Sequence, residues 1–234
     1  MKHIFICIIS IILLGFCFVS CAARIDGSVA ANGSASITVS VSLMPRMASM
    51  IQSFAAASGQ ADGPVLNGPE IAQSMASAPG IESVAFRNTF STSIEGQIKV
   101  SQIGEFLASE GEGFISFQQQ AGRGRIGINI NLENGPEILE KLSPEISDYL
   151  NALMAPIVTG EEMSKEDYIE LIATFYNKAI SEEIADSKIR ASIEFPGSIT
   201  SIRGGTFSGR RANFEIPLVD LLVLEMPLIY EVMW

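Results

Sequence analysis

Histidine is absent from the sequence after residue 3, and cysteine is absent after residue 21. The single histidine is His3, and the three cysteines are Cys7, Cys17 and Cys21. Without histidine, the chain beyond these positions has no Ser-His-Asp or Cys-His mechanism and lacks the commonest metal ligand. Without further cysteine it forms no internal disulfide, so its stability must come from packing. We therefore expect a protein that is not an enzyme and that holds no metal and no cofactor.

Positive charge is also scarce. The sequence has 15 Lys and Arg residues against 26 Asp and Glu residues, a net charge of −11 at pH 7. A surface of this sign is repelled by nucleic acid and by anionic lipid headgroups. We expect no nucleic-acid partner, and we expect attachment to a membrane to depend on a lipid group and not on a basic face.

An apolar leader opens the chain. Lys2 gives it a positive start, and residues 4–19 are nearly all apolar. This run is shorter than the roughly 20 residues that a transmembrane helix needs. It fits the hydrophobic region of a secretory signal peptide.

Cys21 follows this leader in the manner of a bacterial lipoprotein. Ser20 is the small residue expected before an acylated cysteine, whereas Phe18 stands where such signals usually carry leucine. We predict that residues 1–20 are a lipoprotein signal peptide and that Cys21 becomes a diacylglyceryl cysteine with a further acyl chain such as palmitate. Ordinary cleavage close to Cys21, and retention of the leader as an uncleaved anchor, are the two alternatives.

The remaining residues, 21–234, are predicted to form a single extracytoplasmic domain, long enough to bury a sizeable core. The expected location is a bacterial membrane, with the domain lipid-anchored on the periplasmic face or at the cell surface. The chain is expected to end on a strand, so we expect no second anchor at its C-terminus.

Strict alternation predicts the strands. Ile37, Val39 and Leu43 alternate with serine and threonine, and Asn32-Gly33 before them is a strong hairpin signal with a partner strand at about residues 25–31. The other predicted strands cover about residues 84–90, 94–100, 114–118, 126–132, 189–195, 214–218 and 228–234.

Helices are expected between these runs of strands. One begins at Pro45 and stops near Gly59, and a shorter one covers about residues 69–78. A second pair follows, one helix after Ser143-Pro144 and one from Ser164 toward Ile184. Runs of strands separated by paired helices favour the α+β class: a largely antiparallel sheet with two pairs of helices packed on one face.

Several local motifs together resemble a known family. They are Asn32-Gly33-Ser34 before the Pro45 helix, the run Phe195-Pro196-Gly197-Ser198-Ile199, the Gly204-Gly205 turn and the closing Trp234. In these features, over most of the chain after the leader, the sequence resembles the LppM-type bacterial lipoprotein domain family. The resemblance implies a membrane-tethered, non-catalytic domain on the outer side of a membrane, linked to lipid or glycolipid. Some members of that family add a transmembrane helix, whereas here Cys21 is the expected anchor.

Two motifs suggest chemistry that their surroundings do not favour. Residues 122–127 match the spacing of a dinucleotide-binding loop, but an alternating strand follows where that loop needs a helix, so we expect a hairpin turn. Neighbouring acidic residues are expected to be solvated surface and not the carboxylate pair of a glycosidase. The acidic pairs are Glu110 with Glu112, Glu161-Glu162, Glu166-Asp167 and Glu182-Glu183.

Two groups of side chains are candidates for binding. Arg203, Arg210 and Arg211 flank glycine-containing turns and are a possible contact for a lipid headgroup, since arginine binds phosphate in a bidentate way; ordinary solvated arginines are the alternative. Methionines including Met47 and Met50 can line a pliable lipid cavity or simply belong to the core.

Two functions remain open from the sequence. The first is the binding of a lipid or glycolipid, which requires a continuous apolar cavity. The second is a protein-interaction module of the cell envelope, which requires a filled core and an exposed apolar patch. The sequence names neither the ligand nor a protein partner.

Overall fold

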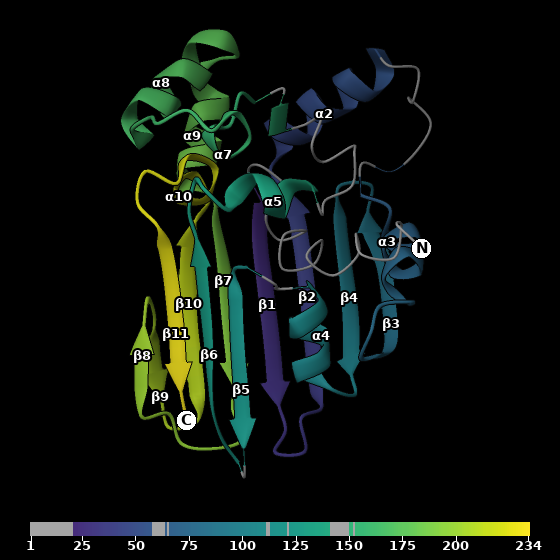
Figure 1. The fold of residues 1–234 in the computed structure, drawn as a ribbon. Helices are drawn as coiled ribbons and strands as arrows, with labels where there is room; N and C mark the ends of the chain where they lie inside the picture. The colour runs from purple at the N-terminus through teal and green to yellow at the C-terminus, as the bar shows by residue number, and fades with distance from the viewer. Residues whose placement is uncertain are drawn as a thin grey trace.

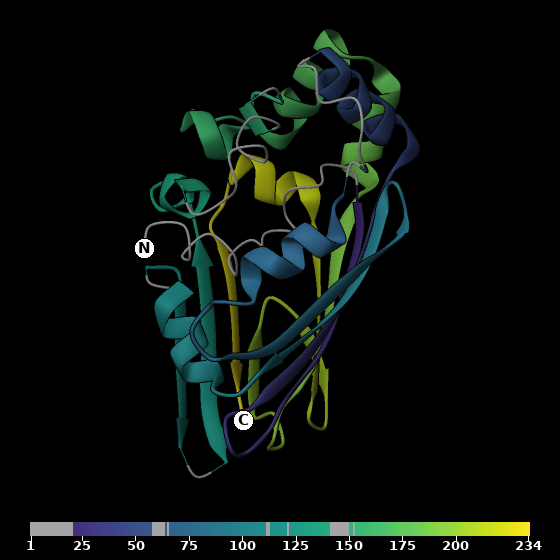
Figure 2. The ribbon, with the colours of Figure 1, turned by 90° about the vertical axis from the view of Figure 1, so that its right-hand side faces the viewer.

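The computed structural model describes residues 21–57, 64, 66–110, 113–120, 122–140, 150–151 and 153–234. These residues adopt the predicted α+β class, with strands that pair mostly antiparallel. The strands divide between two sheets, which Figure 1 shows one in front of the other. Seen edge-on in Figure 2, the sheets lie close together at one end and diverge toward the other, where most of the helices gather.

The larger sheet, sheet A, has seven strands in the order β3-β4-β2-β1-β7-β10-β9. All neighbours are antiparallel except β1 and β7, which run parallel. Its strands are β1 (Cys21–Val29), β2 (Ala35–Leu43), β3 (Ile81–Phe90), β4 (Ser93–Val100), β7 (Lys188–Glu194), β9 (Thr206–Ser208) and β10 (Arg211–Pro217).

The predicted hairpin at the start of the chain is confirmed. β1 and β2 pair along their whole length, and Gly33 adopts a φ of 85° in the turn between them. The side chain of Asn32 accepts a hydrogen bond from the backbone N–H of Ser34 at 3.0 Å, which fixes the turn.

The smaller sheet, sheet B, has four strands in the order β5-β6-β11-β8. These are β5 (Ile115–Gln120), β6 (Arg123–Ile130), β8 (Ser201–Arg203) and β11 (Leu228–Met233). β8 belongs to sheet B, but the strand that follows it, β9, pairs with β10 of sheet A. The Gly204-Gly205 turn between β8 and β9 therefore joins the two sheets along one side, and Gly204 has a φ of 78° that favours glycine there.

The helices agree with the sequence at some places and differ at others. α2 starts at Pro45 as predicted, and the helix predicted after Ser143 falls mostly outside the described residues. The described helices are α2 (Pro45–Ala57), α3 (Gly68–Met75), α4 (Ile103–Glu110), α5 (Gly135–Glu140), α7 (Pro156–Thr159), α8 (Lys165–Phe175), α9 (Lys178–Asp186) and α10 (Leu218–Val223).

The continuous helix expected from Ser164 to Ile184 was wrong. It breaks between α8 and α9, where the side chain of Asn177 accepts a hydrogen bond from the N–H of Ile180 at 3.0 Å and starts a new helix. The strand expected to reach Leu218 was also too long, because Leu218 is the first residue of α10.

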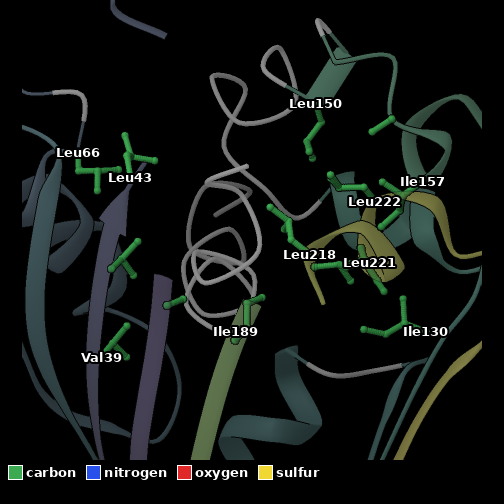
Figure 3. Close-up of a cluster of buried hydrophobic side chains, with 14 of the residues drawn as sticks. Val39, Leu43, Leu66, Ile130, Leu150, Ile157, Ile189, Leu218, Leu221 and Leu222 are labelled. Carbon is green, nitrogen blue, oxygen red and sulfur yellow. The ribbon is translucent and has the colours of Figure 1, made fainter. Parts of the chain in front are cut away.

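The core extends from the space between the sheets into the helical end. Figure 3 shows Val39 of β2 and Ile189 of β7 on the sheet side of this core, and Leu218, Leu221 and Leu222 of α10 close to Ile157. All of these side chains are buried. Burial of one such aliphatic side chain contributes about 1.5–3 kcal/mol, so α10 fixes the helical end to the sheets.

One glycine of sheet A is required by packing. Gly96 on β4 lies opposite Phe86 on β3, and the buried ring of Phe86 covers the position that a Cβ on Gly96 would take. Gly104 in α4 is different, because a Cβ there would make ordinary contact, 3.6 Å, with the ring of Phe117.

We predict that Gly96→Ala lowers the free energy of unfolding by about 1–3 kcal/mol, because the ring of Phe86 must move out of a packed site. Gly104→Ala, the same chemical change in a helix, should leave it unchanged or raise it by about 0.5–1 kcal/mol. Urea unfolding of the two variants checks both values. Equal effects of the two substitutions would contradict the packing role of Gly96.

Candidate ligand-binding site

An apolar cavity of about 190 Å³ lies between the two sheets. Inward-facing side chains of β1, β2, β4, β7 and β10 form one wall, and those of β5, β6 and β11 form the opposite wall. The surface of the cavity is almost entirely apolar. Representative lining residues are Ile37, Ile98, Ile128, Ile189, Ile193 and Phe214.

The cavity exists because some inward-facing positions of the strands carry small residues, whereas most carry bulky apolar ones. Alternating residues of a strand point to the same face, so each strand sends one apolar side chain inward at every second position. At Gly27, Ala35 and Ala191 that inward position carries little or no side chain. A methyl group on Gly27 would lie 2.8 Å from Cδ1 of Ile193, so glycine leaves room for the end of the Ile193 side chain, which would otherwise have to shift.

Helix α4 completes the wall on the side where the sheets are not joined. It packs against β5, the edge strand of sheet B, and directs Ile103, Phe106 and Leu107 into the cavity. The backbone N–H of Ile103 donates to the carbonyl of Gly33 at 2.8 Å and so ties the start of α4 to the β1–β2 turn. α4 was not predicted, although the Ile103, Phe106 and Leu107 spacing is typical of one helix face.

An aromatic cluster lies at the end of the cavity where the sheets approach each other. The ring of Trp234 lies 4.6 Å from that of Phe195 and 6.2 Å from that of Phe117, measured between centroids. The backbone of Trp234 exchanges two hydrogen bonds with Gly124, both 3.0 Å long. The two motifs Phe195-Pro196-Gly197 and Trp234, which are far apart in the sequence, therefore belong to one structural unit.

Tyr230 and Phe214 join the two sheets across the cavity. Their rings meet edge to face, with centroids 5.7 Å apart and planes at 89°. Burial raises the pKa of Tyr230, and the negative charge of Asp220 raises it further. The neutral phenol is thus the form that this site stabilises.

Cys21, the predicted anchor, is the first residue of β1 and pairs in register with Leu43 of β2. Ala23, two residues later, is already buried. The residues that directly follow Cys21 are therefore part of a central strand of sheet A.

The three arginines proposed for headgroup contact do not form one uncommitted group. Arg210 and Arg211 both form ion pairs with Glu194, the latter at 3.0 Å. Arg203 lies on β8 of the other sheet, in register with Glu231 of β11. The carboxylate of Glu194 thus offsets part of the positive charge of these arginines.

Several of the acidic pairs have structural partners. Glu183 accepts hydrogen bonds from the backbone N–H groups of Arg46 and Met47, at 3.3 and 3.2 Å, at the first turn of α2. Asp167 accepts from the hydroxyl of its helix-capping residue, Ser164, at 2.7 Å. Glu182 forms an ion pair with Lys178 at 3.3 Å. These carboxylates cap helices or lie on the surface.

The remaining predicted motifs also find structural roles. The glycine-rich run at residues 122–127 forms the turn into β6 and then the strand itself, as predicted. Met47 is fully buried in the core and, like the other methionines of the described residues, does not line the cavity. Within the described part of the chain, no group of three or more metal-ligating side chains is placed to hold an ion. Among the same residues, no helix combines the length and the apolar character that crossing a bilayer requires.

The fold and site together define an α+β protein with an apolar cavity between two sheets. No protein-family model matches the sequence, and no curated protein matches it. The NMR structure of the folded domain of the Mycobacterium tuberculosis LppM protein is similar to this chain, with a TM-score of 0.42 and 8% sequence identity. The similarity covers 92% of this chain and 88% of that domain.

We predict that stability falls as the pH rises above about 10, the ordinary pKa of tyrosine. Burial raises the pKa of Tyr168, Tyr176 and Tyr230 in the folded chain. The unfolded chain therefore releases these protons at a lower pH than the folded chain, and the free energy of unfolding falls as the pH rises. Tyr230→Phe should reduce this alkaline loss. Urea midpoints at about pH 8 and about pH 10.5 measure the effect, and an equal loss in the variant and the parent would contradict it.

Proposed function

We propose that the protein is a lipid-anchored, non-catalytic binding protein of the bacterial cell envelope, and that its ligand is the apolar chain of a lipid or glycolipid. The observation that carries this proposal is the apolar cavity between the sheets. Although Ser28, Tyr230 and Glu231 are among the lining residues, almost none of the cavity surface is polar. The cavity therefore offers little for acid–base or nucleophilic chemistry, whereas it offers continuous contact to a hydrocarbon chain.

The size of the cavity favours a single chain. Its 190 Å³ exceeds the roughly 150 Å³ of an apolar cavity that stays dry and takes up small apolar molecules. It is below the roughly 300–1,000 Å³ of a pocket for a whole drug-sized ligand. We infer that a chain occupies the space between the sheets while the polar part of the same molecule stays outside.

The position of Cys21 supports a tethered function. Two or more acyl chains on this residue would anchor the protein durably, at about 0.8 kcal/mol per buried methylene. Because β1 begins at Cys21 and Ala23 is buried, such an anchor would hold sheet A close to the bilayer surface.

The alternative, a protein-interaction module, has weaker support. The large apolar side chains exposed in the described residues come from separate elements: Phe90 at the end of β3, Phe175 at the end of α8, Phe207 on β9, Met226 before β11 and Met233 on β11. Isolated exposed apolar residues are normal on soluble surfaces and do not by themselves define a docking patch.

Filling the cavity should abolish binding. Ala191 on β7 lines the cavity, and Ala191→Leu adds three carbon atoms to that space. We expect the affinity for cis-parinaric acid, a fluorescent fatty acid, to fall by about tenfold or more, because the side chain takes the volume that the chain needs. The melting temperature should stay the same or rise, since filling a cavity commonly stabilises a protein.

Ala85→Leu is the matched control. Ala85 lies on β3 and is exposed, so the same added carbons reach solvent and the affinity should not change. Equal affinities for the parent and both variants, or equal losses in both, would reject the cavity as the binding site.

The anchor is tested separately. We predict that Cys21→Ser prevents incorporation of labelled fatty acid and releases the protein from the membrane fraction, because serine lacks the thiol that is acylated. Metabolic labelling and fractionation measure both effects. A variant that remains labelled and membrane-bound would refute the lipid anchor without affecting the cavity.

A further inference from the structure

Two polar atoms at the aromatic end of the cavity are buried without a hydrogen-bond partner. They are Oε1 of Gln119 and Nε1 of Trp234, and among the described residues no other side-chain nitrogen or oxygen is both buried and unpaired. Buried polar groups are nearly always paired, so each unpaired atom requires an explanation. One atom is an acceptor and the other carries a donor hydrogen.

The orientation of the Gln119 amide is fixed. Its Nε2 donates to the backbone carbonyls of Ala30 and Ala31, at 3.1 and 3.4 Å, in the turn between β1 and β2. Because both of these partners are acceptors, the NH₂ group must face them. The oxygen of the amide is therefore the atom left without a partner.

Trp234 lies beside this amide. Gln119 on β5 is directly opposite Gly124 on β6, and the ring of Trp234 occupies the space that a side chain on Gly124 would fill. Side chains of directly opposed residues begin only about 4.5–5.5 Å apart. Trp234 is 5% exposed, so its indole N–H has little access to water.

This pair of atoms lies at the boundary between two environments. Phe117, Phe195 and Val232 line the apolar cavity and also pack in the cluster around Trp234. Gln119 and Trp234 themselves line a hollow on the outer surface, together with polar residues such as Arg123 and Ser198. A molecule with its chain in the cavity and its polar part in this hollow would pass beside Gln119 and Trp234.

We propose that Gln119 and Trp234 form a polar subsite that selects the group joining the chain to the rest of the ligand. A hydroxyl or a secondary amide satisfies both atoms, since it donates to Oε1 of Gln119 and accepts from the N–H of Trp234. An ether or an ester has no hydrogen to donate and leaves Oε1 of Gln119 unpaired. The subsite rests on the proposed function and narrows its ligand to hydroxylated or amide-linked chains.

The test uses the full chain in amphipol and measures displacement of cis-parinaric acid. Trp234 is the one tryptophan of the sequence, so energy transfer from it reports binding of the probe. The competitors are decanol, N-methyldecanamide and decyl methyl ether. We expect the alcohol and the amide to bind about tenfold more tightly than the ether.

Two variants assign the preference to the subsite. Gln119→Leu removes the acceptor, and Trp234→Phe removes the donor but keeps an aromatic ring, with parinaric acid emission then used as the signal. Each should bring the ratio of alcohol to ether affinity close to one. Gln118→Leu is the control, because Gln118 is exposed on the same strand and should keep the ratio of the parent. Comparing ratios also cancels partition of the competitors into the amphipol.

The outcomes separate the subsite from the cavity. If alcohol and ether bind equally to the parent, the two unpaired atoms do not contact the ligand and the subsite is rejected. If the preference is present but survives both variants, its source lies elsewhere and the subsite is again rejected. If no competitor displaces the probe, and the probe itself does not bind, the proposed function fails and the subsite fails with it.

Discussion

The parallel pairing of β1 with β7 is the contact on which the rest of the architecture depends. It joins residues 22–28 to residues 188–194, the two most distant parts of the described chain that meet in sheet A. Without it, sheet A would separate into β3-β4-β2-β1 and β7-β10-β9. The cavity would then lose the continuous wall in which Ile25 lies beside Ala191. Since the pairing is non-local, its chain entropy cost must be met by the apolar surface buried on its inward face.

The two faces of sheet A differ in chemical character. The outer face carries charged pairs, such as Glu215 with Lys188 and Arg190 at 2.6 and 3.1 Å, and hydrogen bonds from these two side chains lower the pKa of Glu215. Such exposed pairs contribute little to stability but keep the surface soluble. The inner face is apolar, so the proposed ligand chain would be selected by its shape and hydration. Near its end, Gln119 and Trp234 carry buried polar atoms without a partner, and the proposed selection by hydrogen bonding would act there.

Local signals predicted the parts of the fold that local physics controls. The Asn32-Gly33 turn formed the expected hairpin because its geometry needs only neighbouring residues. The break at Asn177 was missed because the apolar stripe continues across it, and the choice between one helix and two depends on the cap and on packing. The candidate binding site was even harder to predict from the sequence. The inward face followed from alternation, whereas the pairing of Arg210 with Glu194 and the burial of Gln119 come from strand partners remote in sequence.

The sequence by itself determined the lack of histidine and cysteine in residues 22–234, the net negative charge, the apolar run before Cys21 and the α+β class, because each depends on composition or on short-range periodicity. The tertiary structure decided that the strands form two sheets, that small residues at Gly27, Ala35 and Ala191 face a common space, and that Trp234 lies beside Gln119. These features depend on strand order and register, which are set by the collective burial of side chains that are distant along the chain.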